Sequence, residues 1–134
     1  MDMNVFEIDR AGKAMEILHP ITNAPLKDGN GKPVTVMLVG MDSDEWRQYH
    51  RSLLDDRLNE TTKKTQTAHT IEKEGLEALA VCFKSWSGVT LDGKPLECTR
   101  DNAVMLMRRF PSFRRQVDEF VGKHANFLKA SAKR

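Results

Sequence analysis

The segment Trp86–Phe113, WSGVTLDGKPLECTRDNAVMLMRRFPSF, decides the fold, because a tight polar turn separates two amphipathic stretches. Glycine is common just past a helix end, so Ser87-Gly88 predicts the end of a preceding helix. Asp92-Gly93 lies between two short apolar runs and predicts a β-hairpin. We therefore expect the chain to reverse here, so that the helices on either side of the hairpin pack on each other.

Two further helices are predicted after the hairpin. Thr99 is expected to cap the first helix and Pro111 to stop it. Its inward face is expected to hold Ala103, Val104, Met107 and Phe110. Ser112 opens the next helix, with apolar residues at spacings of three and four: Phe113, Val117, Phe120, Val121, His124, Phe127 and Leu128. This stripe predicts an amphipathic helix in which His124 is a half-buried core residue.

A helix over Thr70–Ser85 is predicted before the hairpin. Its expected apolar face consists of Ile71, Gly75, Ala78, Leu79, Cys82, Phe83 and Trp86. A glycine inside a helix costs about 1 kcal/mol relative to alanine, so Gly75 indicates either close packing or a weak point. We favour close packing against another helix, and we expect Cys82 to be a small buried apolar residue.

Another helix is predicted to start at Asp42 or Ser43. Asp42 can cap it while Glu45 reaches back, as in a capping box. Its expected apolar stripe holds Trp46, Tyr49, His50, Leu53, Leu54 and Leu58, with His50 half-buried. The polar segment that follows, NETTKKTQTAHT (residues 59–70), predicts a loop or a frayed helix end.

The first forty residues are expected to be extended. Val5 and Ile8 are apolar candidates near the start, and Pro33–Gly40 is a β-branched run typical of a strand. The residues between 21 and 33 have turn chemistry. We expect a small antiparallel ribbon or sheet here, and hence an α+β, mainly α, fold. One domain would span 1–134, with a β-rich part at 1–40 and about four helices in 42–130.

The sequence of 134 residues has the composition of a folded domain, with 40% hydrophobic and 30% charged residues. No apolar run approaches the roughly 18 residues of a membrane helix, and the acidic start lacks the layout of a signal peptide, which favours the cytosol. The two cysteines are expected to be free thiols. Residues 108–134 carry eight Lys/Arg against two Asp/Glu. Such a basic end can contact nucleic acid or an acidic protein, or it can be a solvated helix face.

No catalytic residue, cofactor or metal site is predicted. The histidines His19, His50, His69 and His124 lie far apart and lack the spacing of a zinc site. The glycine-rich turns lack the spacing of a phosphate loop. We expect the carboxylates to be solvated on polar helix faces: Asp55, Asp56, Glu72, Glu74 and Glu77. The pattern argues against an enzyme and leaves the surface as the functional part.

The hairpin is the first candidate partner-binding region. Trp86 and Leu91 lie around it, and tryptophan is a common anchor in interfaces. The following MLMRRF mixes methionines with arginines, a composition that adapts to partners. The alternative is that Met105 and Met107 fill the core.

Two segments carry a resemblance to a known family. Residues 17–51 (ILHPITNAPLKDGNGKPVTVMLVGMDSDEWRQYHR) lead from a turn-rich stretch into a helix, and residues 81–128 contain Trp86, Gly88, Asp92-Gly93 and Asn102 before the last helix. In this order of features the chain resembles the tail assembly chaperones of long-tailed bacteriophages. The resemblance covers roughly residues 17–128, and none of its motifs is a catalytic signature.

The resemblance implies a non-enzymatic protein of the infected host's cytoplasm. Such a protein binds the tape-measure protein, keeps it soluble and helps to recruit tail-tube subunits, and it is expected to form a homo-oligomer. The arginines flanking Pro111 are the expected contact patch: Arg108, Arg109, Arg114 and Arg115. The alternatives are a minor tail or head–tail connector protein of the virion, and a nucleic-acid-binding regulator.

Overall fold

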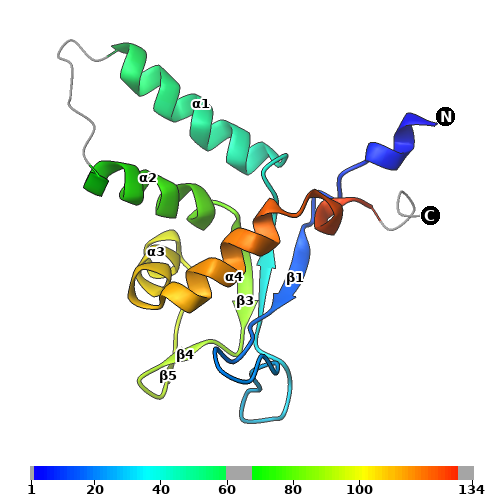
Figure 1. Cartoon of the computed structure of the whole chain (residues 1–134), viewed down its shortest axis with the longest axis vertical. Coiled ribbons are helices and arrows are strands. Elements are labelled where there is room, and N and C mark those ends of the chain that lie inside the picture. Colours follow the sequence, from blue (N-terminus) through cyan, green and yellow to red (C-terminus); the bar gives the residue numbers. More distant parts are fainter. Residues whose placement is uncertain (1, 60–67, 130–134) are drawn as a thin grey trace.

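A three-stranded antiparallel sheet, with helices packed beside it, carries the core of the computed structural model, which describes residues 2–59 and 68–129 (Figure 1). The sheet has the order β1-β2-β3, with β1 at Lys13–Glu16, β2 at Thr35–Leu38 and β3 at Phe83–Ser87. The helices and short elements are α1 (Asp44–Asn59), α2 (Ala68–Ala80), α3 (Arg100–Arg109), α4 (Pro111–Gly122), the 3₁₀ turns η1 (Met3–Phe6) and η2 (His124–Phe127), and the hairpin strands β4 (Thr90–Leu91) and β5 (Lys94–Pro95). The predicted α+β, mainly α, class is confirmed.

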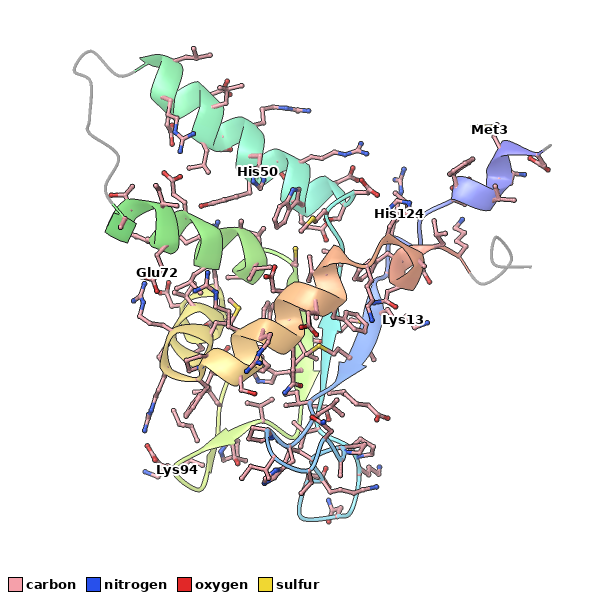
Figure 2. The ribbon with its side chains drawn as sticks, in the orientation of Figure 1. Met3, Lys13, His50, Glu72, Lys94 and His124 are labelled. Carbon is pink, nitrogen blue, oxygen red and sulfur yellow. The ribbon has the colours of Figure 1, made fainter. Side chains whose placement is uncertain are left out.

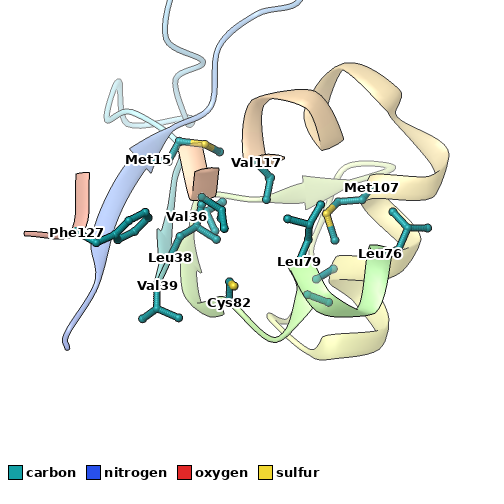
Figure 3. Close-up of a cluster of buried hydrophobic side chains, with 13 residues drawn as sticks. Met15, Val36, Leu38, Val39, Leu76, Leu79, Cys82, Met107, Val117 and Phe127 are labelled. Atoms are coloured by element: carbon teal, nitrogen blue, oxygen red, sulfur yellow. The ribbon is translucent and has the colours of Figure 1, made fainter. Parts of the chain in front are cut away.

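The central strand β2 supplies the middle of the core. Its side chains alternate, so Val36 and Leu38 are fully buried while Thr35 and Met37 are half-buried. Figure 3 shows these two residues among side chains from every layer of the core. The labelled neighbours are Met15, Val39, Leu76, Leu79, Cys82, Met107, Val117 and Phe127. The burial of Cys82 confirms its prediction as a small apolar residue.

The prediction of a helix over Thr70–Ser85 is wrong for its last five residues, 81–85. The helix α2 ends at Ala80, and the residues after it form β3 on the open edge of β2. Lys84 has no partner in the register, which pairs Leu38 with Phe83 and Met37 with Ser85. This bulge turns Phe83 and Trp86, three residues apart, toward the same face, where their rings are 6.1 Å apart. The bulge therefore gives the apolar residues of this strand a spacing that is typical of a helix.

The interpretation of Gly75 as a close-packing site is also wrong. A Cβ built on Gly75 would meet only a guanidinium nitrogen of Arg114, at 3.9 Å. Space for a methyl group is therefore present, and Gly75 is a weak point of α2.

The hairpin and the helix after it are confirmed. Asp92 and Gly93 both have positive φ, 52° and 78°, as a two-residue turn between antiparallel strands requires. Thr99 caps α3 by accepting a hydrogen bond from the Asn102 amide at 3.1 Å. The helices α2 and α3 pack against each other through a shared core that includes Ala103 and Met107. Phe110, expected to face inward, is instead 39% exposed.

Two predicted details of the helices are wrong. The helix α3 ends before Pro111 as predicted, but Pro111 is itself the first residue of α4, where its missing N–H is not needed, so α4 begins one residue earlier than expected. The cap of α1 is Ser43 and not Asp42: the Ser43 hydroxyl accepts from the Trp46 amide at 3.2 Å and donates to the Gly40 carbonyl at 2.6 Å. Asp42 instead pairs with His124.

The last predicted helix is shorter than its apolar stripe. It ends at Gly122, and η2 turns Phe127 into the core. His124, at the start of η2, is exposed and not a core residue (Figure 2). Leu128 forms an isolated bridge with Ile8, which ties the two ends of the chain together. The extended start predicted around Val5 is replaced by the turn η1.

The helix α1 buries less than its sequence predicts. Trp46, Tyr49 and Leu53 are half-buried, but His50 is exposed, and Leu54 and Leu58 are 56% and 73% exposed. The segment 60–67, which holds most of the predicted polar loop, lies outside the described residues. Among the described helices, none has the length and apolar character needed to span a membrane.

Candidate docking groove

An apolar groove of about 630 Å³ runs between the β1–β2 connection and the corner that joins α3 to α4. The connection contributes one wall, residues 88–90 contribute the end next to the hairpin, and the α3–α4 corner contributes the other wall. The apolar lining consists of Ile17, Leu18, Pro20, Leu26, Val34, Val89, Leu106, Phe110, Pro111 and Phe113. This volume lies within the range of binding sites for small molecules and side-chain clusters.

The wall made by the β1–β2 connection is ordered by its own backbone. Leu18 bridges to Pro25 and Lys27 bridges to Pro33, so the connection forms two successive narrow loops. Inside the second loop the Asp28 carboxylate accepts hydrogen bonds from the amides of Asn30 and Lys32, at 2.8 and 3.0 Å. Asx-type bonds of this kind hold a turn without a packed core beneath it.

Gln116 joins this wall to α4. Its side-chain amide donates to the Leu18 carbonyl and accepts from the Leu18 N–H, both at 2.9 Å. The side chain thus replaces a neighbouring strand and satisfies both backbone groups of one residue. These two hydrogen bonds tie the connection to α4 at Leu18.

The α3–α4 corner supplies the floor and a cationic rim. Leu106 is buried, while Phe110 stays 39% exposed, with the Arg109 guanidinium 5.2 Å from the centre of its ring. Lys27 lines the opposite wall. Asp28 also lines the groove, and its carboxylate keeps its negative charge while it accepts from backbone amides, so the lining holds two cations and one anion.

The structure brings only one of the six predicted partner-binding residues to this groove, namely Arg109. Trp86 is half-buried, and its indole N–H donates to the Leu96 carbonyl at 2.7 Å, so it anchors the hairpin to the core. Leu91 is half-buried in β4. The other arginines diverge, since Arg108 lines the α2–α3 surface and Arg114 lies 3.9 Å from Glu72 of α2. Arg115 is exposed on α4, outside the groove lining.

Sequence reasoning missed the wall that the β1–β2 connection provides. The segment 21–33 was interpreted only as turn chemistry, although Leu26 lies within it, and Leu18 and Val34 flank it at intervals of eight residues. Apolar residues spaced through a turn-rich segment were the available signal.

A second, polar hollow of about 650 Å³ lies between α1 and the start of α3. Within it the Tyr49 hydroxyl donates to the Glu77 carboxylate at 3.0 Å, and the Arg100 guanidinium lies 5.2 Å from the Tyr49 ring centre. Burial, followed by the hydrogen bond and charge of Glu77, raises the pKa of Tyr49 to about 12. The tyrosine therefore stays protonated at neutral pH.

Of the five carboxylates predicted to be solvated, Asp55, Asp56 and Glu72 are exposed, whereas Glu74 and Glu77 are half-buried. Glu77 is bonded to Tyr49, and Glu74 accepts from Arg57 at 2.6 Å. Glu45 pairs with Lys84 at 2.9 Å; burial works against ionisation of Glu45, but the hydrogen bond and charge of Lys84 lower its pKa. These pairs hold α1 against the rest of the molecule.

Both thiols have low reactivity. Burial, assisted by the charge of Glu45, raises the pKa of Cys82 to about 12, and burial also raises the pKa of Cys98. A protonated thiol is a poor nucleophile and a poor metal ligand. Over residues 2–59 and 68–129, no group of three or more His, Cys, Asp or Glu side chains is placed to hold a metal ion.

Comparison with protein-family models, with curated proteins and with solved structures found no match to this chain.

Proposed function

We propose that this protein is a non-enzymatic tail assembly chaperone of a long-tailed bacteriophage. In the host cytoplasm it binds the tape-measure protein, keeps it soluble and helps to recruit tail-tube subunits. The observation that carries the proposal is the apolar groove between the β1–β2 connection and the α3–α4 corner.

The groove has the chemistry needed to shield a partner's apolar residues. An amphipathic helix binds by placing its apolar stripe in such a groove, and polar groups at the rim fix its orientation. Phe110 offers an exposed aromatic ring inside the groove, and aromatic rings are frequent anchors of protein interfaces. Arg109 and Lys27 favour a partner with acidic residues beside its apolar stripe.

Weak binding at one groove is sufficient for this function. A tape-measure protein is a long, aggregation-prone helix, so many chaperone molecules can line one partner. Linked weak contacts gain affinity through effective concentration. The groups with raised pKa values, Tyr49, Cys82 and Cys98, are held in their protonated forms, which fits a binding role better than nucleophilic or base catalysis.

Co-expression with the tape-measure protein tests the proposal. We expect the wild-type chain to increase the soluble fraction of the tape-measure protein, and Phe110→Asp to remove most of that increase by placing a charge in the groove. Phe6→Asp is the matched control, because Phe6 is 54% exposed and lies outside the groove lining. Equal solubility of the tape-measure protein with and without the wild-type chain would refute the proposed function.

A further inference from the structure

The polar hollow between α1 and the start of α3 is separate from the docking groove, and the two share no lining residue. Its volume of about 650 Å³ is that of a binding site for a small molecule or for side chains of a partner. The lining comes from α1, from residues 77–81, from Phe83 of β3 and from residues 98–100. A ligand in the hollow would therefore contact α1 and the core at the same time.

One part of the hollow is apolar. Leu53 of α1 lines it together with Val81 and Phe83, and all three side chains are half-buried, so each keeps exposed surface that a ligand can cover. The ring of Tyr49, also half-buried, adds an aromatic surface. Apolar side chains gain by removing hydrocarbon from water, so this lining favours a ligand with a hydrocarbon body.

The charged groups of the lining are mainly acidic. Glu45 is compensated by Lys84, at 2.9 Å. Glu77 keeps an uncompensated charge because its hydrogen-bond donor is a neutral hydroxyl, and Asp56 is exposed and forms no ion pair within residues 2–59 and 68–129. Arg100 is the basic residue of the lining. Two carboxylates thus face one guanidinium, and a cationic ligand would compensate the difference.

The ionisation of Tyr49 reports the electrostatic potential inside the hollow. Burial is the largest cause of its raised pKa, followed by the hydrogen bond of Glu77. The charges of Glu77 and Glu74 raise the pKa further, and together they outweigh the opposing charge of Arg100. The potential at the hydroxyl is therefore negative. The guanidinium of Arg100, 5.2 Å from the centre of the Tyr49 ring, shows that a cation is accommodated against this ring.

We propose that the hollow binds an organic ammonium ion with an apolar body. The body lies against Leu53, Val81 and Phe83, and the ammonium group lies near the carboxylates of Asp56 and Glu77. A free alkylamine and the lysine side chain of a partner protein share this chemistry, because each joins an ammonium group to a hydrocarbon chain. The inference concerns a different surface from the groove and does not rest on the proposed function.

Nuclear magnetic resonance of the ¹⁵N-labelled full chain tests the proposal by titration with 2-phenylethylammonium chloride to about 20 mM at constant ionic strength. We expect the amide signals of residues that line the hollow, such as Leu53 and Val81, to shift with a dissociation constant of about 1 to 10 mM. The control ligand is 2-phenylethanol, which has the same body without the charge. It should bind at least about threefold more weakly, and the binding of the ammonium ion should weaken as salt is added.

Two further ligands distinguish the sources of the ammonium group. Butylammonium has the four-carbon chain of lysine, and N-acetyl-lysine methylamide presents that chain on a peptide backbone. Tighter binding of the lysine derivative would assign the hollow to a partner's lysine. Tighter binding of butylammonium would assign it to a free amine.

Three variants test the part played by the charges. Glu77→Gln and Asp56→Asn should each weaken binding of 2-phenylethylammonium by about two- to fivefold, because each removes one partly solvated charge. Arg100→Gln should tighten binding by a similar factor, because it removes the competing cation. Asp118→Asn is the matched control, since Asp118 is exposed on α4 outside the lining. Asp56 and Arg100 are also exposed, so these variants should fold.

The proposal is overturned if 2-phenylethylammonium leaves the signals of the lining residues in place, or if 2-phenylethanol binds as tightly as the ammonium ion. Weaker binding by Arg100→Gln would also overturn it. So would an equal loss in Asp118→Asn and Asp56→Asn, because the cation would then respond to the net charge of the protein and not to the hollow. None of these outcomes involves the tape-measure protein, so they leave the test of the groove by Phe110→Asp independent.

Discussion

At the scale of single residues, two glycines show how differently the same residue type is used. An added Cβ at Gly40 would lie 2.6 Å from the Phe127 ring, whereas one at Gly75 meets only a guanidinium nitrogen at 3.9 Å. Phe127 can occupy its place in the core only because Gly40 has no side chain. Gly75 makes no comparable contact, and the backbone freedom that glycine has in the unfolded chain lowers the stability of α2.

We therefore predict that Gly75→Ala stabilises the protein by about 0.5 to 1 kcal/mol, because alanine reduces the entropy of the unfolded chain and fits the space present. Gly40→Ala should destabilise it, because the methyl group collides with an aromatic ring fixed in the core. Urea unfolding of both variants measures the two changes in free energy. A Gly75→Ala variant less stable than the wild type would show that α2 needs glycine for a contact absent from the monomer.

Tyr49 allows a second test at this scale, because it is the single tyrosine of the sequence. The near-ultraviolet absorbance of tyrosinate thus reports its ionisation alone. We predict a titration midpoint near 12 in the folded protein, against about 10 in the unfolded chain. Glu77→Gln should lower the midpoint, because it removes a negative charge 3.0 Å from the hydroxyl.

The sign of the resulting pH dependence follows from this shift. The folded state holds the Tyr49 proton more tightly than the unfolded state, so the stabilisation is complete below pH 10 and is lost between about pH 10 and 12. Tyr49→Phe should remove this contribution to the pH dependence of unfolding. An unshifted midpoint in the folded wild type would mean that Tyr49 is solvated and that α1 does not rest on α2 as described.

At the scale of elements, the groove depends on a link between α4 and the β1–β2 connection. We predict that Gln116→Ala destabilises the protein by about 1 to 3 kcal/mol, because both backbone groups of Leu18 lose their partner in a partly buried site. Amide hydrogen exchange at Leu18 should accelerate more than exchange in β2. Gln48→Ala is the matched control, since Gln48 is exposed on α1. Unchanged amide exchange at Leu18 would show that the β1–β2 connection keeps its conformation without Gln116.

The elements also show where sequence reasoning succeeds. The hairpin and the Thr99 cap were predictable because turn and cap geometry depend on a few adjacent residues, here Asp92, Gly93 and Thr99. The strand β3 was not predictable, because its conformation is determined by pairing with a strand about fifty residues earlier. The bulge at Lys84 also gives its apolar residues the spacing of a helix. Arg109 was named as a contact residue, but the opposite wall of its groove comes from a segment distant in sequence.

At the scale of the whole molecule, the chain divides into a core and an attached helix. The core joins the sheet to α2, α3 and α4, and Cys82 is fully buried within it. The helix α1 contributes one half-buried tryptophan, Trp46, to the periphery of that core and is otherwise held by polar pairs such as Glu45–Lys84 and Arg57–Glu74. Exposed ion pairs contribute little stability. The second half of α1 is thus held less firmly than α2, α3 and α4, which share the buried core.

This division predicts two separate opening reactions. Amides in the second half of α1 should exchange through a local opening of low free energy, whereas the Cys82 thiol should react only when the core unfolds. In a Cys98→Ser variant, Cys82 labelling should slow to the rate set by global unfolding, with the denaturant dependence of the complete transition. Both measurements belong at a concentration where the protein is monomeric. Equal free energies for α1 exchange and Cys82 labelling would contradict the division, because α1 would then unfold only with the core. A lower free energy for α1 would show that this helix opens while the sheet and the groove stay intact.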